Sequence, residues 1–349
     1  MYNEQIKRAF IQKYTKSDKT KRLLLHIFGG TQEIEEKYGT DFYAMNTEQA
    51  QEAFTLVTGI RVSGASAILM ILKAYVRWCN ANGYRVSDAV YELRIDVYDK
   101  LKDGYVSSPR HLRETLDAVF PNPALNQIEY IYRSFFWLGF MGLQVSEAIQ
   151  VTEGDLDFRG MRLLFFEKRD KANKDRNQDK TQTKDKPEEK LLPIYPESLA
   201  DLRMAVELVE LREERGAKGV WKQRAAGHEI LRGKVSKLTL EEAVNTTFRP
   251  TISRAFKAAQ DKREQDSSSI PRGASLQLTF KHAYMSGIFY RAYKEEQMGI
   301  PPSFDEIILM ERRNAKVFKP SPNYTERKLL NILIRDMEQD YEHWKSVFG

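Results

Sequence analysis

Apolar residues recur at helical spacing through the first hundred residues of the chain. After a possible cap at Ser63, the stretch SGASAILMILKAYVRWCNANG places leucine, isoleucine, tyrosine and valine every three or four residues and stops at its final asparagines and glycine. The segments on either side each begin with a capping residue and end at glycine, TEQAQEAFTLVTG and SDAVYELRIDVYDKLKDG. The pattern therefore predicts a compact helical domain over residues 1–103.

A short polar stretch interrupts this pattern. The sequence DGYVSSPRH holds a glycine, two serines and a proline, and the residue before a proline favours extended backbone. We place a linker at residues 104–110 and a second domain at residues 111–349.

The second domain combines helical and strand patterns. An almost wholly apolar helix is predicted over NPALNQIEYIYRSFFWLGFMG, and its composition places it inside a core. Two strands are predicted over MRLLFFE and EKLLPIY, with a polar, mobile loop between them. Further helices are predicted over PESLADLRMAVELVELREER, RPTISRAFKAAQDKREQ, LTFKHAYMSGIFYRAYKEEQMG and YTERKLLNILIRDMEQDYEHWKSVFG. The fold class is therefore mainly α with a small antiparallel β-sheet, that is, α+β.

Composition narrows the classes of protein that remain. The chain is 42% hydrophobic, which excludes wholesale disorder, and its net charge of +6 suits a polyanionic partner. Its single cysteine, Cys79, excludes an internal disulfide and a zinc cluster, and we interpret it as a small buried apolar residue in a reduced, cytoplasmic protein. No apolar run is long enough to cross a membrane, and the histidines lack metal-ligand spacing, so we expect neither a membrane partner nor a metal or cofactor.

Three motifs in the second domain point to one family. LGFMGLQVSEAIQVTEGDLDF resembles the first motif of the tyrosine recombinases, the phage integrase family. LTFKHAYMSGIFYRAY is similar to the second motif, and SPNYTERK to the neighbourhood of the tyrosine nucleophile. With the two-domain order, the resemblance covers nearly the whole chain. It implies a helical core-binding (SAM-like) domain and a tyrosine-recombinase-like catalytic domain that clamp double-stranded DNA from opposite sides, without any cofactor.

The first motif gives three residues a role by resemblance. Gly142 ends the apolar helix, and Glu147 braces the helix that follows. Gln144 stands where the family has an arginine that points into the DNA groove. An amide is neutral and cannot offer the two-pronged donor of a guanidinium, so Gln144 either contacts a DNA phosphate weakly or only braces the turn.

The other motifs give the remaining site residues by resemblance. Tyr324 stands at the nucleophile, whose attack on a phosphodiester gives a 3′-phosphotyrosyl link. Lys281 stands in place of the second arginine. A lysine keeps the positive charge but lacks the bidentate donor geometry of a guanidinium. His282 stands at a histidine position of the family, or is simply a half-buried histidine. The hairpin lysine corresponds to Lys168, and further charge at the DNA comes from Arg312 and Arg313.

These replacements favour binding over cleavage. Removal of one donor to a transition-state oxyanion typically lowers the rate by about 10²–10³. Our first hypothesis is therefore a cleavage-deficient, sequence-specific DNA-binding regulator, such as a phage or mobile-element repressor. The alternative is an active, divergent integrase that works through Tyr324. A third possibility is an assembly protein that uses its C-terminal helix and no DNA, and the same helix could also join copies into a homo-oligomer.

Overall fold

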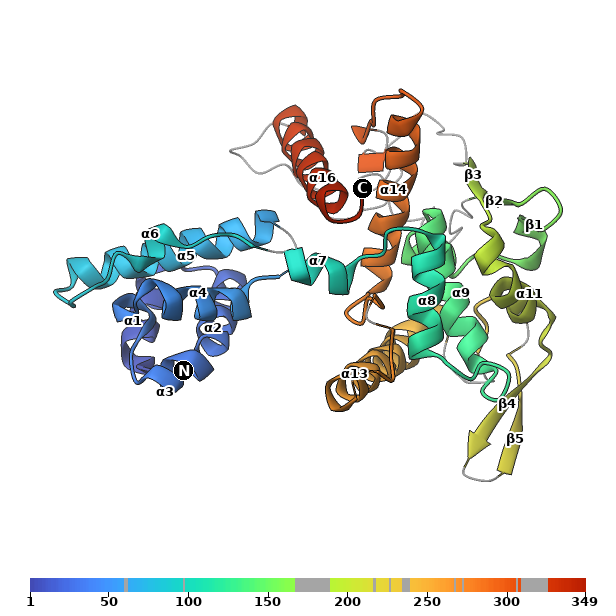
Figure 1. Cartoon of the computed structure of the whole chain (residues 1–349), viewed down its shortest axis with the longest axis horizontal. Coiled ribbons are helices and arrows are strands. Elements are labelled where there is room, and N and C mark those ends of the chain that lie inside the picture. Colours follow the sequence, from blue (N-terminus) through green and yellow to red (C-terminus); the bar gives the residue numbers. More distant parts are fainter. Residues whose placement is uncertain are drawn as a thin grey trace, which may run out of the picture. The chain divides into compact units, whose positions relative to one another are not determined.

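The structure of the chain, a computed structural model, consists of two compact units. It describes residues 1–349 except for 60–61, 97, 167–188, 216–217, 226, 234–238, 267, 272, 306 and 309–325. One unit comprises Met1–Leu101 with Phe304–His343, and the other comprises Lys102–Ser303 with Trp344–Gly349. The described residues are mainly helical with small antiparallel sheets, which confirms the predicted α+β class (Figure 1).

Short helices with one shared core build the first unit. They are α1 (Glu4–Tyr14), α2 (Asp18–Gly30), α3 (Gln32–Tyr38), η1 (Phe42–Ala44), α4 (Thr47–Val57), α5 (Val62–Ala81), α6 (Ala89–Glu92) and the start of α7 (Tyr98–Gly104). The core contains Phe10, Phe28 and Tyr75, whose rings pack edge to face. Cys79 is a free, wholly buried thiol in the same core, which confirms the prediction that it is a small buried residue.

A buried ion pair crosses this core. The Lys7 ammonium donates to the Glu35 carboxylate, and neither side chain is exposed to solvent. Glu35 also accepts from the Thr31 hydroxyl at 3.1 Å and from the Phe42 N–H at 3.0 Å. Burial raises the pKa of Glu35 and that of the neighbouring Asp41, so both carboxylates depend on the lysine charge beside them.

The second unit is built around one central helix. Its helices are α8 (Pro109–Val119), α9 (Ile128–Met141), α10 (Val145–Ala148), η2 (Glu153–Asp155), η4 (Pro196–Ser198), α11 (Leu199–Glu207), α12 (Leu240–Ala243), the π-helix η5 (Val244–Phe248), α13 (Arg249–Gln265) and α14 (Phe280–Gln297). The last helix of the chain, α16 (Glu326–Phe348), belongs to both units. Nearly every side chain of α9 is buried, which confirms the predicted core helix.

The described residues of the second unit also form two small antiparallel sheets. Strands β1 (Leu156–Asp157), β2 (Arg162–Phe166) and β3 (Glu189–Pro193) pair in that order, with Leu163 opposite Leu192. The strands predicted at MRLLFFE and EKLLPIY are thus confirmed. A separate hairpin joins β4 (Glu210–Arg215) to β5 (Lys218–Gln223).

This second hairpin corrects one prediction. We predicted a helix through LREER, but α11 ends at Glu207 and the chain becomes extended. Partners distant in sequence fix the strand, because the Gln127 N–H donates to the Arg212 carbonyl and the Gln127 side chain accepts from the Arg212 N–H, each at 2.9 Å. Leu211 then lies fully buried in the core. Tertiary contacts therefore override a locally helical composition.

The central helix is tied to its neighbours by a polar network around the buried Arg133. The Arg133 guanidinium donates from Nε to Asp201 at 2.9 Å and from Nη2 to Asp117 at 2.6 Å. The Trp137 indole N–H donates to the other Asp201 oxygen at 2.8 Å. Because Asp117 lies on α8 and Asp201 on α11, this network holds both helices against α9.

Helices α9 and α14 touch at their backbones. A Cβ added to Gly287 of α14 would lie 1.7 Å from the carbonyl oxygen of Phe140 on α9, so only glycine allows this approach. The crossing places the start of α14 at a fixed position relative to the end of α9 (Figure 1).

The final turn of α16 packs on the second unit of its own chain. Trp344 is fully buried, and its indole N–H donates to the Val106 carbonyl at 3.2 Å. Its ring lies against Phe289 and Tyr293 of α14, and Lys345 pairs with Glu296 at 2.7 Å.

His111, in the first turn of α8, holds the segment before this helix in place. Its Nδ1 accepts from the Ser107 N–H at 3.0 Å, and its Nε2 lies 2.7 Å from the Gly273 carbonyl oxygen. The neutral ring satisfies both contacts, whereas a second proton on Nδ1 would oppose the Ser107 N–H. Burial accordingly lowers the pKa of His111.

This arrangement predicts a loss of stability in mild acid. As the pH falls below about 6.5, His111 binds a proton in the unfolded chain but stays neutral in the folded chain. The free energy of unfolding therefore falls until the pH reaches the lower pKa of folded His111. Urea midpoints measured between pH 7.5 and 5.5 check this, and His111→Gln should flatten the dependence. His228→Gln is the matched control, because His228 is exposed and should leave the dependence as it is. An equal slope in the chain with and without His111 would contradict the assignment.

Candidate functional site

The turn after α9 is fixed by a glycine and an arginine. Gly142 has φ of 113°, the left-handed region that glycine tolerates, and a Cβ there would lie 2.8 Å from Nη2 of Arg291. Arg291, on α14, donates from Nη1 to the carbonyls of Phe140 and Met141 at 3.0 and 3.1 Å. The guanidinium therefore satisfies the carbonyls that the end of α9 leaves open.

The next turn starts α10 through the backbone of Gln144. The Gln144 N–H donates to the Glu147 carboxylate at 2.8 Å, and its carbonyl accepts from the N–H groups of Glu147 and Ala148. The second Glu147 oxygen accepts from Lys190 of β3 at 2.6 Å, and both side chains of this ion pair are largely buried. Glu147 therefore joins the helix start to the sheet, and the Gln144 side chain is left half-buried.

The start of α14 presents the second group of predicted site residues. Lys281 lies in its first turn and is exposed, without an ion pair to any described residue. The Thr279 hydroxyl caps the helix by accepting from the His282 N–H at 3.2 Å. The His282 ring is half-buried and stacks on Tyr105, with ring centroids 4.9 Å apart. Lys281 thus adds its charge to the positive end of a helix dipole, whereas His282 packs against a neighbouring ring.

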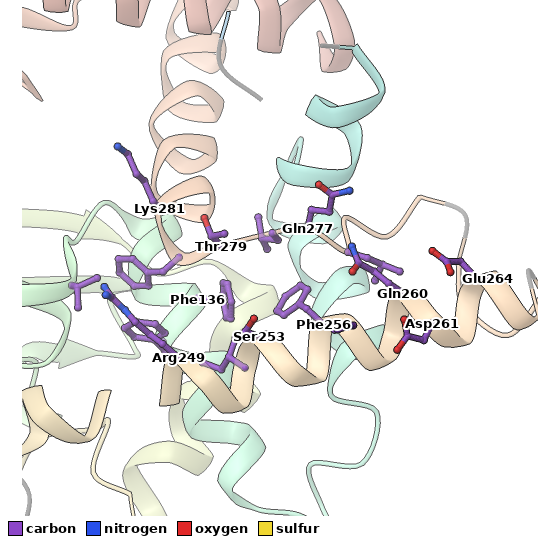
Figure 2. Close-up of a pocket in the computed structure, with 17 residues that line it drawn as sticks. Phe136, Arg249, Ser253, Phe256, Gln260, Asp261, Glu264, Gln277, Thr279 and Lys281 are labelled. Carbon is purple, nitrogen blue, oxygen red and sulfur yellow. The ribbon is translucent and has the colours of Figure 1, made fainter. Parts of the chain in front are cut away.

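One cavity connects these two turns. It has a volume of about 920 Å³ and lies between α13 and the segment that leads into α14, with Phe136 and Phe256 at its middle (Figure 2). Val145, next to Gln144, and Lys281 both line it. The lining is completed by Phe135, Arg249, Ile252, Ser253, Lys257, Gln260, Asp261, Glu264, Leu276, Gln277, Leu278, Thr279 and Phe280.

Two further cations line this cavity besides Lys281. Arg249 and Lys257 lie on the cavity side of α13, and both are exposed. Neither forms an ion pair with a residue that the structure describes. Three cationic side chains without acidic partners are therefore available to an anion at the mouth of the cavity.

Four of the predicted site residues lie outside the described residues. They are the candidate nucleophile Tyr324, the hairpin lysine Lys168, and the charged pair Arg312 and Arg313. Their roles stay predictions from the resemblance. The structure brings the turns of Gln144 and Lys281 to one cavity, and it places His282 against Tyr105.

Sequence reasoning missed four residues of this site. Lys190 and Arg291 hold the two turns through contacts distant in sequence, and no local pattern marked either of them. Arg249 and Lys257 stand eight residues apart, which places them on one face of a helix that was predicted. That spacing was the available signal.

A comparison with known families identifies the N-terminal part of the chain. Residues 1–81 match the family model described as MrpR, N-terminal core-binding domain. Domains of this kind occur in tyrosine-recombinase-like proteins, so the match indicates a DNA-binding, recombinase-like protein. The core-binding domain predicted at the N-terminus is thereby confirmed for these residues. The match ends with α5, and none of the curated proteins compared with the chain matches it.

Within the described ranges, no three histidine, cysteine, aspartate or glutamate side chains are grouped so that they could hold a metal ion. Among the helices of the same ranges, none has the length and apolar character needed to span a bilayer.

Proposed function

We propose that this chain is a sequence-specific double-stranded DNA-binding protein of the integrase fold whose strand cleavage is lost or greatly reduced. It would act in the cytoplasm as a repressor-like regulator of a phage or another mobile element. The core-binding domain at residues 1–81 is the observation that carries the DNA-binding part. Phosphate contacts supply most of the affinity of such proteins and do not depend on catalytic geometry.

The residues around the cavity support the loss of cleavage. Gln144 and Lys281 stand where the resemblance expects two arginines, and an amide and an ammonium lack the fork that clamps a phosphoryl transition state. Because loss of a single such donor lowers the rate by about 10²–10³, replacement of both arginines favours DNA binding without cleavage. The exposed cations Arg249, Lys257 and Lys281 remain suited to phosphate contacts.

The experiment is a pull-down of fragments of the source genome on the purified chain, followed by titration of the enriched fragment at several salt concentrations. Lys281→Gln should weaken binding by about tenfold and reduce the salt slope by about one, because one phosphate contact is lost. Lys294→Gln is the matched control, since Lys294 is an exposed lysine at the other end of the same helix. If no fragment is bound in a salt-dependent way, the DNA-binding proposal fails.

The same bound DNA tests cleavage. Hot detergent should release all of it from the protein. DNA that stays attached to the wild-type chain, and is released from Tyr324→Phe, would identify a working nucleophile and overturn the cleavage-deficient part of the proposal.

Assembly through α16 belongs to the same proposal. Its middle keeps three half-buried apolar residues, Ile332, Leu333 and Ile334. Sedimentation equilibrium, with and without the bound fragment, tests whether they join two copies.

A further inference from the structure

The contact proposed between Lys281 and DNA uses one end of the cavity and leaves the rest without a role. The cavity follows α13, whose stretch from Arg249 to Glu264 is about 22 Å long at 1.5 Å per residue. Figure 2 shows Arg249 and Lys281 at one end and Asp261 and Glu264 at the other. A site for a single phosphate would not need this length.

The two ends of the cavity carry opposite charges. Arg249 and Lys281 make one end positive, the exposed carboxylates Asp261 and Glu264 make the other end negative, and Lys257 lies between Arg249 and Asp261 along α13. A simple polyanion such as a DNA strand would meet repulsion at the acidic end. A compact anion would leave that end unused. The arrangement suits an elongated ligand that carries an acidic group at one end and a basic group at the other.

The middle of the cavity is apolar, and its edges are polar. Phe136 and Phe256 lie at the middle, where apolar groups of a ligand bind most favourably. Hydroxyl and amide side chains stand along the edges, from Ser253, Gln260, Gln277 and Thr279. Such groups both donate and accept hydrogen bonds. An extended peptide needs such partners for its backbone, whereas a helical peptide already pairs its own N–H and carbonyl groups.

We propose that this cavity binds a short extended peptide. About 22 Å accommodates six or seven residues at roughly 3.3 Å each. The peptide has an acidic residue or its carboxylate near Arg249 and Lys281, apolar side chains over Phe136 and Phe256, and a basic residue or its amine near Asp261 and Glu264. Each class of lining residue then has a matching part of the ligand.

Peptide binding and DNA binding would exclude each other, a relation that rests on the proposed function. Lys281 lines the cavity and is the proposed phosphate contact, so peptide and DNA compete for one ammonium group. A bound peptide would weaken DNA binding, and the proposed regulator would respond to it.

The test selects random seven-residue peptides, displayed on phage, against the full chain in the absence of DNA. Enriched sequences should carry an acidic end, an apolar middle and a basic end. Synthetic copies, followed by fluorescence anisotropy, should lose about tenfold in affinity with Arg249→Glu and with Asp261→Lys, because each reversal turns an attraction into a repulsion. Lys262→Glu is the matched control, since Lys262 is exposed on α13 outside the cavity.

Two results would overturn the peptide proposal. One is the absence of any enriched sequence relative to a selection without protein. The other is a set of enriched peptides whose affinity is the same in both cavity variants and in wild type. Single-stranded oligonucleotides that bind more tightly to Asp261→Lys and more weakly to Arg249→Glu would assign the cavity to nucleic acid and also reject the peptide.

The competition is measured separately, by adding a selected peptide to the complex with genomic DNA. Loss of DNA binding supports the relation to DNA, whereas simultaneous binding overturns it and leaves the peptide site standing. A chain that binds peptide and no DNA would refute the proposed function alone, so the two failures are distinguishable.

Discussion

Gly287→Ala is expected to lower the free energy of unfolding of the second unit by about 3 kcal/mol or more. The added methyl would lie 1.7 Å from the Phe140 carbonyl oxygen, and this obstacle is backbone inside a helix rather than a side chain that can rotate away. Helices α9 and α14 must therefore move apart. For a unit of this size the melting temperature should fall by about 6–12 °C, measured by circular dichroism or calorimetry.

A second helical glycine provides the control. Gly29 lies in α2, and a Cβ added there meets nothing within 4 Å. Gly29→Ala should leave stability unchanged or raise it by about 0.5–1 kcal/mol through helix propensity. An unchanged melting temperature for Gly287→Ala would mean that the two helices do not meet at their backbones.

Lys7→Met is expected to destabilise the first unit by about 3–5 kcal/mol. The substitution keeps an apolar stem of similar length but leaves the Glu35 carboxylate buried without its cation. Asp41, whose pKa burial also raises, loses the same favourable charge. Denaturant unfolding of the full chain gives the midpoint for this change.

The double variant Lys7→Met/Glu35→Gln separates the charge from the packing. The amide removes the buried charge: its oxygen can still accept from the Phe42 N–H, and its NH2 can donate to the Thr31 hydroxyl oxygen. It should recover most of the stability that Lys7→Met loses. Lys37→Met, which breaks the exposed pair with Glu52, should hardly change the midpoint. If the double variant is as unstable as the single one, buried charge is not the cause.

Local patterns were sufficient for elements whose own residues specify them. Spacing and composition predicted the apolar helix α9, the helices α13 and α14, and the strands β2 and β3. The β4 strand was not. Its charged residues suit a helix, and its extended form depends on Gln127, far away in sequence.

The candidate site divides in the same way. Gly142, Gln144, Glu147 and Lys281 were found because the resemblance fixes their order along the chain. That Glu147 pairs with Lys190, or that Arg291 caps the end of α9, follows only from the folded arrangement. The cavity itself needs four helices and a loop to exist, so no pattern in one segment could predict it.

The way Gln144 is built into its turn bears on how easily this site changes over evolution. The bonds described for the turn use the backbone N–H and carbonyl of Gln144, and an arginine in its place would keep every one of them. Lys281 is exposed and meets no packing barrier to exchange. In the genetic code, glutamine and lysine codons each stand one base away from an arginine codon. Two point mutations would thus place a pair of guanidiniums at these positions, and the backbone bonds of the turn would be kept.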